Sequence, residues 1–223
     1  MADRPIIFSA PMVRALLDGR KTQTRRLLRI SRHRSISEFG PSDTKGYDWH
    51  FRDVGMRWHD LRHAELMKRL PYAIGDRLWV REAFCYQQWH NQYIDIDYVA
   101  DPGSPYLTYR TPPAGAKIKL GDRYKGPRYP SIHMPRWASR LTLTVTDVRV
   151  QRLREISRAD AIAEGIRPCR QGGWMADNED TSAPEPEEAF RALWLSLHGP
   201  GSWEANPWVV ALTFTVERRN IDA

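Results

Sequence analysis

Residues 140–150 alternate between apolar and polar side chains, the pattern of a β-strand with one buried face. Leu141, Leu143 and Val145 fall on one face and the threonines between them on the other, and the phase of the alternation changes near Asp147. A final strand is predicted over residues 209–218, where every second side chain is apolar. The chain therefore has to build a sheet that includes its middle and its end.

Helical patterns separate the predicted strands. Phe190, Leu193, Trp194 and Leu197 recur at helical spacing and predict an amphipathic helix over 187–198, with Trp194 in the core. Further elements are predicted as strands over 5–8, 22–28, 76–82 and 94–100 and as short helices over 10–18, 61–70 and 157–164. This alternation indicates the α+β class, as a small closed or half-closed β-barrel with helices packed outside it.

Three segments lack clean periodicity. Residues 31–70, 86–131 and 170–186 are rich in glycine, proline, tyrosine or charge, and we interpret them as long loop insertions. The first is expected to be an inserted or mobile loop with a short helix near its end. The 223 residues suffice for one domain with an ample core, so we predict a single domain over 1–223.

Composition excludes several classes of protein. No apolar stretch approaches the roughly 18 residues of a membrane helix, and the apolar patch near the N-terminus is shorter than a signal peptide requires. Two cysteines, Cys85 and Cys169, are too few for a disulfide scaffold, and Cys85 is expected to be a small buried side chain rather than a nucleophile. We expect a cytoplasmic protein with no membrane partner.

Positive charge is concentrated in one short segment. Residues 20–34 hold seven of the 34 lysines and arginines and no acidic residue, so the remaining 27 basic residues balance the 27 acidic ones. A local excess of this kind points to a polyanionic partner, and nine tryptophans and nine tyrosines supply rings that could stack on bases. The plain alternatives are a solvated basic face and an aromatic core.

Common signatures of cofactor and metal sites are missing from the sequence. There is no glycine-rich phosphate loop, dinucleotide fingerprint or nucleophile elbow. His59 and His63 are four residues apart and could share a helix face and bind a metal, but no third ligand is evident. We therefore expect no metal and no cofactor.

Residues 19–26 read Gly-Arg-Lys-Thr-Gln-Thr-Arg-Arg and resemble the Gly-x-Lys-Thr-x-Thr-x-Arg signature of ASCH domains, which belong to the PUA-like superfamily. Gly75-Asp76 before a strand resembles the family's Gly-Asp turn, and residues 161–166 resemble its later helix with an acidic residue. Residues 131–137 and 206–208 look like segments of the phage and prophage branch. The resemblance implies a PUA-like barrel, here about twice the length of a minimal ASCH domain.

The same resemblance implies a ligand and a site. PUA-like domains generally bind RNA or modified bases, some ASCH proteins remove the acetyl group of N4-acetylcytidine, and others are linked to RNA cleavage. The Lys, Thr and Glu of the amidohydrolase branch correspond to Lys21, Thr24 and Glu164. We expect recognition of a nucleoside, RNA or DNA, with hydrolysis of an N4-acyl group as its enzymatic form. The alternatives are a non-catalytic reader of nucleic acid and a ribonuclease.

The chemistry of these three residues can be argued independently of the family. The hydroxyl of Thr24 is a weak nucleophile until a base accepts its proton, and Lys21 is such a base only if its pKa falls. Burial and the neighbouring arginines favour that fall, whereas Glu164 opposes it while orienting Lys21 or moving a proton to the leaving amine. In an ideal strand Lys21 and Thr24 point to opposite faces, so Lys21 has to lie in the turn after Gly19 or beside a bulge.

Other residues are candidates for holding the ligand. Arg20, Arg25 and Arg26 could bind phosphates, and Arg136 could do so while a base stacks on Trp137. The plain alternatives are that Lys21 and the arginines only hold phosphates, that Thr24 is a strand residue with a satisfied hydroxyl, and that Glu164 is a salt-bridge partner at a helix end. Trp137 could equally be a core residue at the entry of a strand. The further aromatic candidates are Trp79, Tyr124, Tyr129, Trp203 and Trp208.

Overall fold

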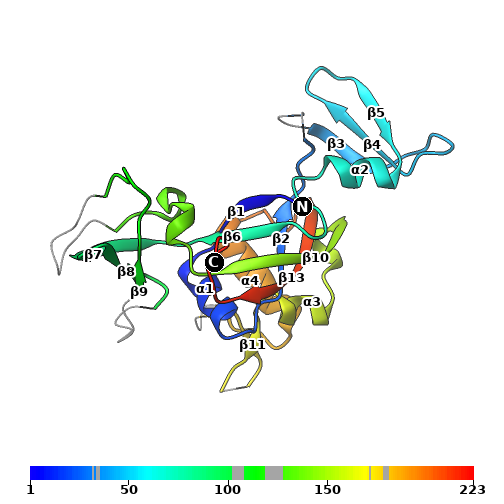
Figure 1. Cartoon of the computed structure of the whole chain (residues 1–223). Helices are drawn as coiled ribbons and strands as arrows, with labels where there is room; N and C mark the ends of the chain where they lie inside the picture. The colour runs from blue at the N-terminus through cyan, green and yellow to red at the C-terminus, as the bar shows by residue number, and fades with distance from the viewer. Residues whose placement is uncertain (32, 34–35, 102–107, 119–127, 171, 178–180) are drawn as a thin grey trace.

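A central sheet of five strands organises the molecule (Figure 1). The computed structural model describes residues 1–31, 33, 36–101, 108–118, 128–170, 172–177 and 181–223. In order across the sheet the strands are β1 (Asp3–Ile7), β6 (Arg77–Arg81), β10 (Thr142–Arg152), β13 (Trp208–Glu217) and β2 (Gln23–Leu27). Only the β1–β6 pair is parallel.

The α+β class predicted from the sequence is confirmed, whereas a closed barrel is not. Within the described ranges no ladder joins β1 to β2, so the central sheet is open at both edges. The register of β10 against β13 shifts between Val145 and Asp147, where the sequence changes phase. A bulge lets one long strand keep apolar residues in the core on both sides of the irregularity.

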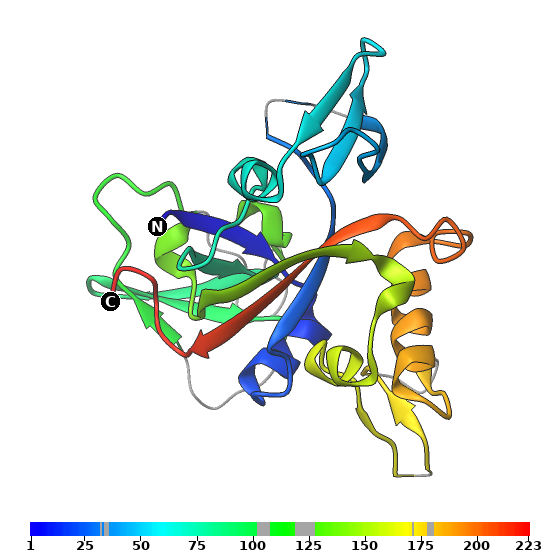
Figure 2. The same cartoon turned by 90° about the vertical axis from the view of Figure 1, so that its right-hand side faces the viewer.

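Helices cover both faces of this sheet (Figure 2). On one face, Val13 and Leu16 of α1 (Ala10–Leu17) join a cluster with side chains of β6, β10 and β13. On the other, Phe190 and Trp194 of α4 (Pro186–His198) pack with Val209 and with α3 (Arg158–Ala163). Trp194 is 3% exposed, as its helical spacing predicts.

Two short helices end where the sequence places their stops. The side-chain oxygen of Ser157 accepts a hydrogen bond from the Asp160 amide and begins α3. Glu164 follows as its C-cap, and Gly165 then takes a φ of +104°. Gly19 takes a φ of +73° after α1 and turns the chain toward β2. These two turns place the ends of α1 and α3 beside one another, since the Thr22 amide donates to the Ala163 carbonyl at 2.8 Å.

The first insertion folds into a second sheet. Strands β3 (Ile36–Pro41), β4 (Trp49–Asp53) and β5 (Trp58–Leu61) are antiparallel, and α2 (His63–Arg69) follows them. The sequence predicted a loop with a short helix here; the helix is present, but three strands occupy part of the predicted loop. His59 lies in β5 and His63 begins α2, so the expectation that they share a helix face is wrong.

The second insertion forms a third sheet that projects in a different direction from the first (Figure 1). It contains β7 (Phe84–His90), β8 (Tyr93–Tyr98) and β9 (Thr108–Arg110). Short 3-10 turns, η1 (Ser131–His133) and η2 (Arg136–Ala138), lead back to β10, and η3 (Leu153–Glu155) leaves it. The two-residue strand β11 (Arg167–Pro168) lies just before the third insertion and pairs with β12 (Trp174–Met175) inside it. No helix in the described ranges has the length and apolar character to cross a membrane.

Candidate functional site

Lys21 and Glu164 form a buried ion pair between the start of β2 and the end of α3. Lys21 is 0% exposed, and its Nζ donates to Glu164 Oε2 at 2.5 Å and to the Glu164 carbonyl oxygen at 2.8 Å. The Lys21 amide donates to the Ala15 carbonyl, so Lys21 belongs to the turn after Gly19 and not to the strand. This is one of the two geometries in which Lys21 and Thr24 can serve one site.

Gly165 allows the close approach that this ion pair requires. A Cβ atom at this position would lie 3.2 Å from the Ala15 Cβ and 3.4 Å from the Lys21 Cβ, tighter than ordinary packing. The backbone of Gly165 also has a positive φ, which a residue with a side chain adopts only with strain. The glycine after Glu164 therefore brings the end of α3 against Lys21.

Burial lowers the pKa of Lys21 below its ordinary value of 10.5, and the charges of Arg26 and Arg25 act in the same direction. The nearby carboxylate of Glu164 opposes the shift by its charge and its hydrogen bond. At a given pH the neutral form of Lys21 is therefore more populated than that of a lysine in water. Perturbed pKa values are common at functional sites.

Arg25 links this ion pair to α3. Its Nη2 lies 2.9 Å from Asp160 Oδ2, and its Nη1 lies 2.5 Å from Gln23 Oε1 and 3.6 Å from Glu164 Oε1. Asp160 also accepts hydrogen bonds from Gln23 and Arg149. Although burial opposes the shift, these bonds and the charge of Arg25 hold the pKa of Asp160 below its ordinary range. Asp160 supports the site and was not among the residues predicted from the sequence.

Three buried polar atoms around this network have no hydrogen-bond partner among the described residues. They are Glu164 Oε1 and the Nε atoms of Arg25 and Arg26. Most buried polar groups in proteins are paired, because an unpaired group costs about 1–3 kcal/mol. A ligand bound beside Lys21 could therefore form hydrogen bonds with these donors and this acceptor.

Thr24 is buried in β2, three residues after Lys21, and is not bonded to the ion pair among the described residues. It pairs with Leu212 in the sheet and is 3% exposed, and in the described part of the chain its hydroxyl forms no hydrogen bond with Lys21 or Glu164. Strand alternation places Thr24 on the same face of β2 as Arg26. The guanidinium of Arg26 lies 5.1 Å and Lys21 Nζ 5.8 Å from the centre of the Phe8 ring. The ring of Phe8 therefore lies near both Lys21 and the face of β2 that carries Arg26. The sequence analysis did not identify Phe8 as a candidate.

The basic residues of segment 20–26 point mostly toward internal partners. Arg20 binds Asp18 and the Gly165 carbonyl, and Arg26 donates to the Ile7 carbonyl at 2.6 Å. With Lys21 and Arg25 buried against carboxylates, the charge of this segment is largely compensated within the protein. It forms a polar network between β2 and α3 rather than a freely solvated basic face.

The other predicted ligand-binding residues lie in separate surroundings. Arg136 binds Asp3 and Asp222, whose hydrogen bonds raise its pKa, and Trp137 stacks on Tyr86 with ring centres 5.9 Å apart. Trp79 lies under the guanidinium of Arg81. No hydrogen bond or ion pair in the described ranges joins Arg136, Trp137 or Trp79 to Lys21, and Tyr124 lies outside the described residues.

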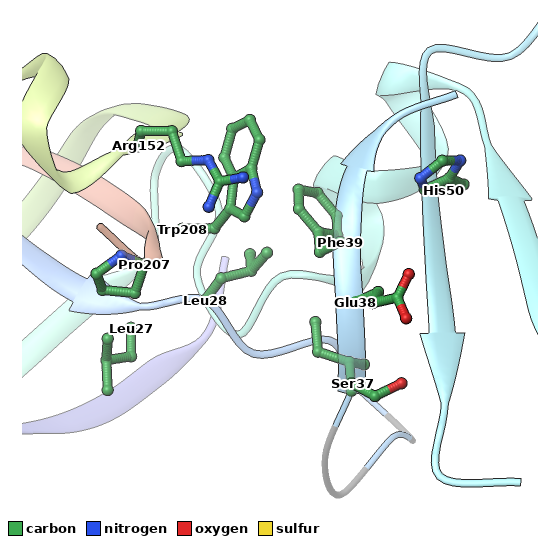
Figure 3. Close-up of a pocket in the computed structure, with 10 residues that line it drawn as sticks. Leu27, Leu28, Ser37, Glu38, Phe39, His50, Arg152, Pro207 and Trp208 are labelled. Carbon is green, nitrogen blue, oxygen red and sulfur yellow. The ribbon is translucent and has the colours of Figure 1, made fainter. Parts of the chain in front are cut away.

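A cavity of about 560 Å³ opens between the central sheet and the first insertion (Figure 3). Leu27, Leu28, Pro207, Trp208 and Arg152 face it from the central sheet and the turns beside it. From the insertion come Ile36, Ser37, Glu38, Phe39 and His50. Arg152 lies 4.5 Å above the Trp208 ring, and the rings of Phe39 and Trp208 meet edge to face at 5.2 Å. We call this cavity the interlobe cleft.

The interlobe cleft could not be located from the sequence, because half of its wall is an insertion predicted to be loop. Trp208 alone among its residues was an aromatic candidate. Neither this cleft nor the two smaller cavities described in the molecule is lined by Lys21, Thr24 or Glu164, within the ranges that the structure covers.

Comparison with known proteins gives no relative: no family model, curated protein or solved structure matches this chain. The resemblance to ASCH domains therefore depends on the motifs of the chain alone.

Proposed function

We propose that this chain is an ASCH-type protein with a PUA-like arrangement of its central strands, folded as one domain over 1–223. It recognises a nucleoside or nucleic acid carrying a modified base and hydrolyses an N4-acyl group of cytosine or cytidine. The observation that carries this proposal is the fully buried Lys21 Nζ, 2.5 Å from Glu164 Oε2. Folding alone gains little from such a pair, since apolar residues of the same volume are often as stable or more so.

The reaction assigns one role to each residue. The neutral form of Lys21, which burial favours relative to a lysine in water, accepts the hydroxyl proton of Thr24 as its oxygen attacks the acyl carbon. The bond from that carbon to N4 breaks, and the amino group leaves with a proton delivered from Lys21. Water then hydrolyses the threonine ester, so that one acylated cytosine and one water give cytosine and a carboxylic acid. Glu164 orients Lys21 throughout.

This chemistry requires Thr24 to come within hydrogen-bond distance of Lys21 when substrate binds. Hydrogen bonds of catalytic groups often tighten only in the complex with substrate. Glu164 Oε1 and the two arginine Nε atoms, which form no hydrogen bond among the described residues, supply groups that a polar base could engage. Phe8 provides an apolar surface beside Lys21.

The test is turnover of N4-acetylcytidine to cytidine, followed by chromatography. Thr24→Ser keeps a hydroxyl and should retain activity, whereas Thr24→Ala should lose it, by a factor of about 10² or more as expected for a lost nucleophile–base pair. Lys21→Arg keeps the charge but cannot act as a base, so it should be inactive. Equal activity of Thr24→Ala and the native protein would contradict the proposal.

The interlobe cleft favours a second function, that of a non-catalytic reader. Trp208 and Phe39 present rings, and Arg152 presents a cation, on facing walls of one cavity. Aromatic rings beside a cation bind single-stranded nucleic acid by stacking and phosphate contact. Salt-sensitive binding of an oligonucleotide without any turnover would favour this function over hydrolysis.

A further inference from the structure

The first insertion contains a cluster of metal-binding side chains that the proposed function does not use. His33, Asp53 and His59 each contribute one nitrogen or oxygen atom, and these atoms lie within 4.8 Å of one another. His33 precedes the small sheet, Asp53 ends β4 and His59 lies in β5. Two imidazoles and one carboxylate are a common ligand set for zinc and related divalent transition metals.

The spacing of these atoms suits a small metal ion. Zinc bonds of about 2.0–2.1 Å place neighbouring atoms of a tetrahedral site about 3.3 Å apart. His59 Nε2 and Asp53 Oδ2 are already 2.9 Å apart, and one ligand atom from each of the three residues lies within 4.8 Å of the others. An ion between the three requires shifts of about an ångström, which rotation of a half-buried His33 side chain can supply.

Both imidazole rings pack against Phe51. This residue is 0% exposed, and His59 stacks on its ring at 4.6 Å while His33 meets it edge to face at 4.7 Å. The other carboxylate oxygen of Asp53 accepts a hydrogen bond from the Arg57 amide at 3.1 Å. Contacts of this kind orient ligands before a metal arrives and raise its affinity.

If these three residues had only a structural role, the hydrogen bond between Asp53 and His59 would be explained, but the cavity beside them would not. A cavity of about 490 Å³ is lined by both histidines together with Ser31, Lys68 and Arg69. The guanidinium of Arg57 also contacts Asp53, but its side chain is 77% exposed and can turn into water at little cost. The carboxylate is therefore available to a metal, and an open coordination position would face the cavity.

We propose that His33, Asp53 and His59 bind a divalent transition metal of the zinc class, with the remaining position open to the cavity. A divalent ion with one carboxylate keeps a net positive charge, and Lys68 and Arg69 add two more. The ligand at the open position is therefore an oxyanion such as phosphate. His63 is not a ligand, because it begins α2 and its Nδ1 accepts a hydrogen bond from Trp49 at 3.3 Å.

The test uses the full chain after treatment with a chelator. Calorimetric titration with Zn²⁺ should show one equivalent bound. His33→Gln and Asp53→Asn should each lower the affinity at least about tenfold, while the matched control His63→Gln keeps it. Circular dichroism of the metal-free variants verifies their fold. If His59→Gln unfolds because Phe51 loses its stacked ring, His33→Gln decides, since His33 belongs to neither the small sheet nor a helix.

Cobalt(II) and inorganic phosphate test the open position. Phosphate should change the visible spectrum of the Co²⁺-loaded protein, and the Lys68→Ala, Arg69→Ala double variant should weaken that response without weakening Co²⁺ binding. Absence of saturable Zn²⁺ binding, or native affinity in His33→Gln, would overturn the metal site. An unchanged Co²⁺ spectrum in phosphate would overturn the open position. None of these results depends on turnover of an acylated base.

Discussion

Lys21 and Glu164 are 143 residues apart in the sequence, yet the ammonium group of Lys21 contacts both the carboxylate and the carbonyl oxygen of Glu164. Their side chains are 1% and 3% exposed. Removal of one partner leaves the other buried without its counter-charge, whereas removal of both does not. The pair therefore couples the turn after α1 to the end of α3, and its energetic coupling can be measured.

A double-mutant cycle with Lys21→Met and Glu164→Gln measures this coupling. Each single variant should lower the free energy of unfolding by about 3 kcal/mol, because a buried charge loses its partner. The double variant should lose clearly less than the sum of the two. Urea unfolding provides the values, and Lys45→Met, at an exposed turn, is the control that should change stability little. Additive losses would show that the two residues act independently.

The stability of Glu164→Gln should depend on pH. Burial holds the pKa of Lys21 below 10.5, and loss of Glu164 removes the charge that opposes this shift. Between that lowered pKa and 10.5, the unfolded chain binds a proton at Lys21 that the folded chain lacks. Stability therefore rises with pH in that window. The measurement is the unfolding midpoint from neutral to alkaline pH. If the difference in midpoint between Glu164→Gln and the double variant does not change with pH, the expectation is contradicted.

Gly165→Ala should disturb the ion pair through packing as well as backbone strain. The new Cβ would press on Ala15 and Lys21, and a φ of +104° is strained for alanine. We expect a loss of about 1–3 kcal/mol in the free energy of unfolding. Gly172→Ala is the matched control, since Gly172 has a φ of +95° and nothing within 4 Å of its Cβ position. Equal losses in the two variants would assign the effect to strain alone.

Asp160→Asn should remove part of the acid sensitivity of the fold. The folded pKa of Asp160 lies below the unfolded value of 3.8, so its contribution is complete above that value and is lost as pH falls through the folded pKa. At neutral pH the variant should be less stable by about 2–4 kcal/mol, because Arg25 is left buried. The difference from the native protein should shrink in acid. Thermal unfolding across this pH range measures the difference in stability between the variant and the native protein. A difference that does not change with pH would contradict the prediction.

The interlobe cleft should contribute to binding of single-stranded oligonucleotides. Trp208→Leu should weaken binding by about 1–3 kcal/mol, as for a lost stacking partner. Arg152→Gln should lower the dependence of binding on salt by about 0.7 in slope, as for one lost phosphate contact. Arg158 lies 5.1 Å over Trp174 in a similar pair away from the cleft, so Arg158→Gln and Trp174→Leu are matched controls. Binding is measured by fluorescence anisotropy at several salt concentrations. If the cleft has no special role, the cleft variants and the control variants should change binding equally.

Regular elements with long periodic patterns could be predicted from the sequence. Strand β10 has the expected alternation and the expected irregularity at Asp147, because a bulge changes which side chains face the core. Helix α4 begins and ends close to the predicted residues, since its apolar stripe is continuous and Gly199 ends it. The turn at Gly165 was also predictable, because glycine adopts its backbone conformation without strain.

The first insertion and the direction of the arginines could not be predicted. Strands β3, β4 and β5 have four to six residues each, too short for a periodic signal, and their core depends on contacts such as Phe39 with Trp208. Arg25 points inward because Asp160 of α3 and Glu164, which caps that helix far along the chain, compensate its charge. Local composition carries no information about such distant partners.

The rings of Phe39 and Trp49 both meet Trp208 edge to face, at 5.2 and 5.5 Å, and so join the insertion to the start of β13. Phe39 and Trp49 also pack against the main apolar cluster, which includes Phe51 and Leu66 of the insertion. The two walls of the cavity are consequently braced by the same contacts that stabilise the folded chain. A ligand that enters the cleft would therefore bind between walls whose positions are already fixed by folding. Binding would then require little further loss of conformational entropy in the protein.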